Sequence, residues 1–194
     1  MDEAIVIWVN QTLAHPYADT LFIWLSQRIS FALPVALIIL AALLWRYRVN
    51  GLKLWLLLLL TISCGDALGN YIKHTVTSAR PCYDIYESVR QPLTQSTAPC
   101  NGKSSAMPSN HTLNFMAAAS FISLILRIPI VTFSLFLIAG LVAFSRLYLA
   151  MHYPSQILAG AAIGCLIGYI FAQLSVKCLP FIQSIRQRPN NRSL

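Results

Sequence analysis

Six residues of the sequence have side chains suited to binding and transferring a phosphate group. They supply three positive charges, one hydroxyl and two imidazoles: Lys73, Arg80, Ser109, His111, Arg146 and His152. Cations and hydroxyl donors stabilise phosphate oxygens, and histidine exchanges protons near neutral pH. Each of the six lies near the end of an apolar segment, so these segments must position them. We therefore expect one basic, histidine-containing site at a membrane surface, with chemistry on a lipid phosphate.

The composition predicts an integral membrane protein with a single domain. Of the 194 residues, 57% are hydrophobic and 10% are charged, against roughly 25% charged residues in soluble domains. Apolar stretches of about 20 residues, the length that crosses a bilayer, recur along nearly the whole chain. The formal charge of +8 does not indicate nucleic-acid binding, because the basic residues form no continuous patch. We expect a membrane domain over residues 1–180 and a basic cytoplasmic tail over residues 181–194.

Five apolar segments predict an all-α membrane bundle with five transmembrane helices. They are residues 24–45, 52–73, 108–126, 130–150 and 155–176. Residues 4–17 are shorter and are interrupted by polar residues and a proline, which is typical of a helix lying in the membrane interface. A sixth, short crossing by this N-terminal segment is the alternative.

The basic residues predict the orientation of the chain in a bacterial inner membrane. Of the 14 Lys and Arg residues, eight flank one end of the spans and six the other. Three of those six, Lys73, Arg80 and Arg146, are site candidates, which leaves three. Because positive loops remain in the cytoplasm, the side with eight is expected to be cytoplasmic. The site and the loop of residues 77–107 then face the periplasm.

Two cysteines in this loop, Cys82 and Cys100, are expected to form a disulfide. They lie in the only polar segment assigned to an oxidising compartment, whereas the other three cysteines lie in or beside helices. By the chain-entropy model, closing a loop of this size contributes about 3 kcal/mol. The alternative is a pair of free thiols.

Three short clusters contain the candidate site residues. The first places Lys73 and Arg80 at the exit of the second span. Snorkelling of basic side chains to the headgroups is the simpler explanation for these two taken alone. The second, residues 107–112, begins a helix with Pro108, so the N–H groups after it lack intrahelical partners and can bind an anion. An ordinary capped helix start is the alternative there.

The third cluster places Arg146 and His152 at the outer end of the fourth span. An arginine within an apolar span is costly unless an anion pairs with it. The only acidic residue in the spans is Asp66, which is most simply a partner for another buried polar group, with a proton relay as the alternative. We infer that the anion for Arg146 is the substrate phosphate. The scarcity of carboxylates disfavours a magnesium site, so we expect no metal and no other cofactor.

Together the three clusters resemble the type 2 phosphatidic acid phosphatase superfamily. The pattern of that family is Lys, six residues, Arg-Pro; then Pro-Ser-Gly-His; then Ser-Arg, five residues, His, three residues, Asp. The resemblance implies a helical bundle and a metal-free phosphohistidine mechanism. His152 is then the nucleophile, and His111 protonates the leaving oxygen and later helps to activate water. The resemblance also implies that four residues hold the phosphate: Lys73, Arg80, Ser109 and Arg146.

The chain departs from the family pattern at two positions. Asn110 replaces the motif glycine, where its backbone N–H remains available and its side chain either narrows the pocket or adds a further donor for the phosphate. Gln156 replaces the aspartate that orients the nucleophilic histidine. Glutamine supplies an acceptor oxygen without the charge, so we expect Gln156 to set the imidazole tautomer. A serious loss of rate is the alternative, since an Asp-to-Asn change in serine proteases costs about 10⁴-fold.

We predict a phosphatase that removes a terminal phosphate from a membrane lipid phosphate or diphosphate. Undecaprenyl diphosphate, phosphatidylglycerol phosphate, phosphatidic acid and the 1-phosphate of lipid A all fit the resemblance. The additional donors His74, Lys103 and Asn110 mildly favour a diphosphate. Two alternatives are a phosphotransferase that passes the phosphoryl group to a lipid or sugar hydroxyl, and a non-catalytic binder of lipid phosphates.

Overall fold

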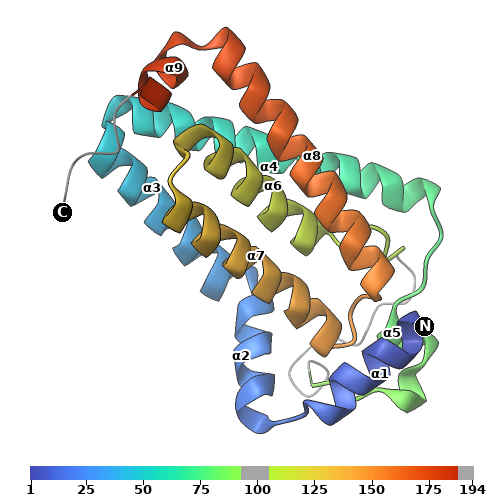
Figure 1. The fold of residues 1–194 in the computed structure, drawn as a ribbon. Helices are drawn as coiled ribbons and strands as arrows, with labels where there is room; N and C mark the ends of the chain where they lie inside the picture. The colour runs from blue at the N-terminus through green and yellow to red at the C-terminus, as the bar shows by residue number, and fades with distance from the viewer. Residues whose placement is uncertain (93–104, 188–194) are drawn as a thin grey trace.

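The computed structural model describes residues 1–92 and 105–187, and every regular element within them is helical (Figure 1). In chain order the elements are α1 (Asp2–Thr12), α2 (Pro16–Ser26), the π-helical turn η1 (Arg28–Ala32), α3 (Leu33–Tyr47), α4 (Val49–Thr75), α5 (Pro81–Asp84), the 3-10 turn η2 (Tyr86–Ser88), α6 (Asn110–Leu126), α7 (Pro129–Tyr148), α8 (Pro154–Cys178) and α9 (Pro180–Gln187). This arrangement confirms the predicted all-α bundle.

Five crossing helices form the bundle. η1 and α3 together form one continuous helix from Arg28 to Tyr47. This combined helix is long and apolar enough to cross a membrane, and so are α4, α7 and α8. α6 has 17 residues, which corresponds to about 26 Å. It packs against α4, α7 and α8 and so occupies the middle of the bundle. The chain is therefore a multi-pass membrane protein, as predicted.

The first crossing differs from the predicted span of residues 24–45. The backbone of Gln27 is extended, with φ −85° and ψ 135°, and it separates α2 from η1. Trp24 therefore belongs to α2, and the crossing helix begins at Arg28. The other four crossings begin and end within three residues of the predicted spans.

Glycines on α8 allow it to approach α6 closely. A Cβ atom at Gly160 would lie 2.6 Å from the carbonyl oxygen of Ser109, and one at Gly164 would lie 2.3 Å from that of Leu113. Both distances are too short for a real side chain, so a larger residue at either glycine would push the helices apart. The small residues of α8 thus hold the start of α6 against the start of α8.

The largest buried apolar cluster is completed by α9, which lies at the end of the bundle opposite α1 (Figure 1). Ile182 and Ile185 of α9 are both buried and pack into this cluster with residues of α3, α4, α6 and α8. The tail predicted from residue 181 therefore begins with a helix packed on the bundle. Residues 188–194 lie outside the described residues.

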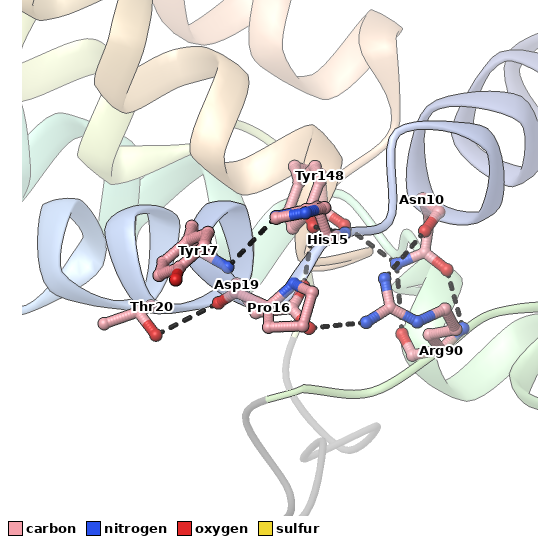
Figure 2. Close-up of polar contacts among 8 residues, drawn as sticks. All are labelled: Asn10, His15, Pro16, Tyr17, Asp19, Thr20, Arg90 and Tyr148. Carbon is pink, nitrogen blue, oxygen red and sulfur yellow. Dashed lines mark hydrogen bonds and ion pairs between the residues drawn. The ribbon is translucent and has the colours of Figure 1, made fainter.

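A polar network fixes the N-terminal helices to the other end of the bundle, where α7 ends (Figure 2). Asn10 is fully buried; its Nδ2 donates to the Tyr148 carbonyl at 2.8 Å, and its Oδ1 accepts from the Arg90 N–H at 2.6 Å. Asp19 accepts from the Tyr148 hydroxyl at 2.6 Å and pairs with the Arg90 guanidinium at 2.5 Å. α1 has 11 residues, or about 17 Å, so it is too short to cross. The segment predicted over residues 4–17 is divided between α1 and the start of α2.

Replacing Asn10 with alanine is expected to lower the free energy of unfolding by about 2–3 kcal/mol, because the Arg90 N–H and the Tyr148 carbonyl lose their side-chain partner. Chemical unfolding of the purified protein in mixed micelles measures the change. The neighbouring Gln11 is exposed and makes one hydrogen bond, to the Ser88 carbonyl. Gln11→Ala is therefore the control, with an expected loss below about 0.5 kcal/mol. Equal losses for the two variants would contradict the role given to Asn10.

Candidate active site

The helix order brings the three sequence clusters to one end of the bundle. Lys73 lies in the last turn of α4, Arg80 immediately before α5, Ser109 immediately before α6, Arg146 in the last turn of α7 and His152 two residues before α8. α4 and α7 end at the level where α6 and α8 begin, because consecutive crossings run in opposite directions. The same end carries α1 and α5 (Figure 1).

Gln156, in the first turn of α8, orients His152 and links it to the loop after α4. The Gln156 Oε1 lies 3.1 Å from His152 Nδ1 and accepts from the Tyr153 N–H at 3.1 Å. Its Nε2 donates to the Ser78 hydroxyl and the Ala79 carbonyl, both at 2.8 Å. Because a carbonyl can only accept, the amide nitrogen must face Ala79 and the amide oxygen must face the ring. His152 therefore carries its proton on Nδ1, and Nε2 is unprotonated.

Two arginines lie close to the imidazole of His152. Arg80 Nη1 is 3.5 Å from His152 Nε2 and 3.4 Å from the Met151 carbonyl oxygen. Arg146 is 6% exposed, and its Nε is buried with no hydrogen-bond partner among the described residues. Both arginines and Lys73 act electrostatically on His152. A buried, charged N–H without a partner is costly, so we infer that an anion entering the site satisfies Arg146.

The surroundings of His152 favour its neutral form. Burial, followed by the positive charges of Arg146 and Arg80, lowers the pKa of His152 well below its usual range. The hydrogen bond with Gln156 acts in the opposite direction and is outweighed. Free histidine becomes protonated below about pH 6.5, whereas His152 keeps its lone pair on Nε2 at that pH and above.

The start of α6 offers hydrogen-bond donors close to Gln156. Ser109 is fully buried, and its backbone N–H donates to the Gln156 carbonyl at 3.1 Å. Its hydroxyl lies 3.1 Å from that of Thr112 and makes no capping bond to the helix. When the Thr112 hydroxyl donates, the Ser109 proton is free for an anion, together with the unpaired N–H groups of the first helical turn.

His111, in the first turn of α6, lies between the cationic residues and the end of α2. It makes a hydrogen bond with the backbone of Ser26, and the charges of Arg146, Arg28 and Lys73 act on it. In the sequence, Arg28 is one of the flanking charges and no motif marks it. The structure places its charge within electrostatic range of the site because the chain bends immediately before it, at residue 27.

The side chain of Asn110 turns toward α4. Its Nδ2 donates to Asp66 Oδ1 at 3.0 Å and to Asn70 Oδ1 at 2.8 Å. The donor that Asn110 retains for a phosphate is therefore its backbone N–H. Asp66 also accepts from Asn70 and Asn114, so its partners are three amides. Among the described residues, no group of three or more His, Cys, Asp or Glu gathers as a metal site requires.

The predicted disulfide falls partly outside the described residues. Cys82 is buried, and its sulfur lies 4.0 Å from that of Met151. Cys100 belongs to the segment of residues 93–104, so the Cys82–Cys100 bond stays a prediction. Lys103, a predicted additional donor, belongs to the same segment.

Comparison with known families matches residues 52–179 to the PAP2 superfamily. The matched segment extends from the first turn of α4 through α8 and contains all three clusters. Among solved structures, the fold is similar to that of a transmembrane PAP2 type phosphatidylglycerolphosphate phosphatase from Bacillus subtilis. The TM-score is 0.70 and the identity 24%, over 93% of this chain and 87% of that one.

Three curated relatives share sequence with parts of the chain. A stretch of 61 residues, 31% of the chain, is 34% identical to the lipid A 4'-phosphatase of Porphyromonas gingivalis and covers 26% of that protein. The lipid A 4'-phosphatase of Bacteroides thetaiotaomicron is 29% identical over 64% of the chain and 55% of its own length. Lipid phosphate phosphatase delta of Arabidopsis thaliana is 33% identical over 64% of the chain and 32% of its own length. The chain thus spans between 26% and 55% of these relatives.

Proposed function

The chain belongs to the PAP2 superfamily, and we propose that it is a membrane lipid phosphatase that removes a terminal phosphate from a lipid phosphate or diphosphate. The observation that carries the proposal is the buried Arg146 guanidinium, whose Nε has no partner among the described residues. It acts on His152, whose orientation suits attack through Nε2. The relatives named lipid A 4'-phosphatase and lipid phosphate phosphatase support the same class of substrate.

In this proposal three cations and the start of α6 hold the phosphate. Three cations lie within electrostatic range of His152, and each supplies positive charge for the phosphate oxygens: Lys73, Arg80 and Arg146. Ser109 adds its hydroxyl proton, and the first N–H groups of α6 add further donors. A phosphoryl group in transfer spreads negative charge over its oxygens, so fixed cations and donors lower the barrier.

The first step transfers the phosphoryl group to His152. The Nε2 lone pair attacks phosphorus, an N–P bond forms and the P–O bond to the lipid breaks. With the phosphate bound, His111 is the imidazolium and gives one proton to the departing oxygen, so the lipid leaves as an alcohol and His111 becomes neutral. For a diphosphate the lipid monophosphate leaves instead. Gln156 accepts the hydrogen bond from Nδ1–H and so keeps the ring oriented as it becomes positive.

The second step hydrolyses the phosphohistidine. His111, now neutral, takes a proton from a water molecule, and the water oxygen attacks phosphorus. The N–P bond breaks, His152 regains its lone pair on Nε2 and inorganic phosphate leaves. Protons and charges balance over the two steps without a metal ion, so metal independence is part of the proposal.

The proposed location is the inner membrane of a bacterium, with the site toward the periplasm. Basic residues gather at the other end of the bundle: Arg46 near the end of α3, Lys53 near the start of α4, Arg127 after α6 and Lys177 near the end of α8. Positive residues of this kind remain in the cytoplasm. The end with His152 then faces the periplasm.

Phosphate release by the purified chain, with a chelator present, tests the function. The panel of substrates comprises phosphatidylglycerol phosphate, phosphatidic acid, a phosphorylated glucosamine lipid and undecaprenyl diphosphate. We expect chelator-resistant release from at least one of them. Release that requires an added lipid or sugar acceptor would identify a phosphotransferase instead. Binding of all four without any release would identify a lipid phosphate binder.

A further inference from the structure

A half-open pocket of about 660 Å³ lies beside the proposed site, lined by the end of α2, η1 and helices α3, α4, α6 and α7. Most of its wall is apolar, but one end is polar and is formed by Arg28, Asp66, Asn70, Asn110, His111 and Asn114. His111 belongs both to this wall and to the proposed site. The polar end of the cavity therefore lies on the side where the lipid alcohol departs.

Asp66 carries the only carboxylate in the five crossing helices. Its Oδ1 accepts hydrogen bonds from Asn110 and Asn114, and its Oδ2 accepts one from Asn70, each at 3.0 Å. Three amide donors stabilise the ionised carboxylate, and a carboxylate has about four acceptor positions. At least one position therefore remains for a donor from a ligand. An ionised side chain at membrane depth is costly and commonly marks a functional position.

Arg28 borders the same end of the cavity from the first position of η1. Its charge acts on Asp66 and His111. Its side chain nevertheless makes no hydrogen bond and no ion pair within 4.0 Å among the described residues. π-helical turns of this kind are frequent at functional sites. The Arg28 guanidinium and the Asp66 carboxylate thus both border the polar end without touching each other. A polar group of a ligand can bind between them.

We infer that the polar end of the cavity binds the alcohol that the reaction releases, and that this alcohol bears free hydroxyl or amide N–H groups. The inference rests on the proposed phosphatase function and specifies its substrate class. A sugar lipid or a phosphatidylglycerol headgroup offers such donors to Asp66, while Arg28 binds an ester or phosphate oxygen of the same molecule. A ligand without such donors displaces water from the remaining acceptor position of Asp66 and leaves that position unfilled, so donor-bearing ligands are preferred.

Two other lipid phosphates fit this end of the cavity less well. Diacylglycerol, released from phosphatidic acid, has no free donor beyond the leaving oxygen itself. A polyprenyl diphosphate places the negative charge of its second phosphate at the leaving oxygen itself, toward Asp66, which repels it. Phosphatidylglycerol phosphate instead has a hydroxyl next to the leaving oxygen, and its phosphodiester lies farther along the headgroup. A diphosphate is therefore disfavoured at this pocket, in contrast to the mild preference for a diphosphate that the sequence indicates.

The test compares phosphatidylglycerol phosphate with phosphatidic acid of the same acyl chains, because the first releases an alcohol with a further free headgroup hydroxyl, on an additional glycerol phosphodiester, and the second does not. A phosphorylated N-acylglucosamine lipid and undecaprenyl diphosphate form a second pair. 4-Nitrophenyl phosphate reports the chemical step without a lipid headgroup. We expect kcat/KM to be at least about tenfold higher for the donor-bearing lipid of each pair.

Asp66→Asn keeps the shape of the side chain and removes its charge. In this variant we expect the kcat/KM values for the donor-bearing and donor-free lipids to lie within about threefold of each other, because KM for the donor-bearing lipids rises. Ser63→Ala is the matched control: Ser63 lines the same cavity and precedes Asp66 by one helical turn. Ser63→Ala is expected to keep the kcat/KM ratio between donor-bearing and donor-free lipids that the unchanged chain shows.

Equal kcat/KM for donor-bearing and donor-free lipids in the unchanged chain would contradict the inference, whether or not the Asp66→Asn protein folds. Loss by one common factor for every substrate, 4-nitrophenyl phosphate included, would contradict it too, because Asp66 would then act only through the structure. If the unchanged chain releases phosphate from none of the compounds, the phosphatase proposal itself fails.

Discussion

Exchange of His152 for alanine is expected to lower phosphate release by at least about 10³-fold while lipid phosphate binding persists. The ring supplies the only nitrogen lone pair aimed at the phosphate in the proposed mechanism, so no other group replaces it. Lys73, Arg80 and Arg146 remain in the variant, and they account for most of the attraction of the phosphate. Phosphate release and equilibrium binding, measured on the same preparation, check the two parts of this expectation.

His15 provides the control histidine for this experiment. It is exposed, and its Nδ1 accepts a hydrogen bond from the Tyr17 N–H at the start of α2. His15→Ala is expected to keep the rate within about threefold, since the side chain lies outside the proposed site. A His152→Ala protein that releases phosphate at more than a tenth of the original rate would exclude His152 as the nucleophile.

Replacement of Gln156 by leucine is expected to reduce phosphate release by about 10²- to 10⁴-fold. Leucine has a similar volume but makes none of the side-chain hydrogen bonds that Gln156 makes with His152, Tyr153, Ser78 and Ala79. The ring then no longer has a fixed tautomer, and the loop before Arg80 loses its link to α8. Phosphate release measures the effect, and thermal unfolding in detergent shows whether the variant is folded.

Aspartate at position 156, the residue of the family pattern, is expected to give a rate about tenfold below that of the natural chain. A carboxylate can accept from His152 but has no donor for the Ala79 carbonyl, which Gln156 satisfies at 2.8 Å. The shorter side chain also withdraws from Ser78. If Gln156→Asp instead matched or exceeded the natural rate, the negative charge would outweigh the contacts to residues 78–79, and the role given to the amide nitrogen would be wrong.

The fold and the meeting of the three clusters could be predicted because they depend on local sequence features. Apolar length defines each crossing. Pro108, which was expected at the first helical position, instead lies two residues before α6, because the helix begins at Asn110 with Ser109 as its N-cap. Alternation of direction then places Lys73, Arg146 and His152 at one end. The predicted span of residues 24–45 missed the bend at Gln27, although Ser26, Gln27 and Arg28 interrupt the apolar stretch there.

The cause of that bend is tertiary. Phe22 of α2 packs against Phe144 and Tyr148 of α7, with ring centroids 5.4 and 4.6 Å away. α2 therefore follows the end of α7, and the crossing helix must start afresh at Arg28. A pattern of apolar residues carries no information on which neighbour an aromatic ring selects.

The partners of the two unusual motif residues were equally inaccessible from the sequence. Gln156 was expected to accept from His152, and it does, but its donors to Ser78 and Ala79 depend on where the loop after α4 lies. Asn110 was expected to add a side-chain donor to the phosphate, whereas that donor goes to Asp66. A carboxylate among apolar helices is a stronger acceptor than any other group within reach of this amide.

The most direct test of the central claim is to trap the covalent intermediate on the purified chain. The protein is mixed with ³²P-labelled lipid phosphate, quenched in alkali within milliseconds to seconds, digested and mapped by mass spectrometry. We expect an alkali-stable, acid-labile phosphoryl group on His152 that is absent from His152→Ala. Rapid phosphate release with no label on His152, or with the label on another residue, would contradict the account.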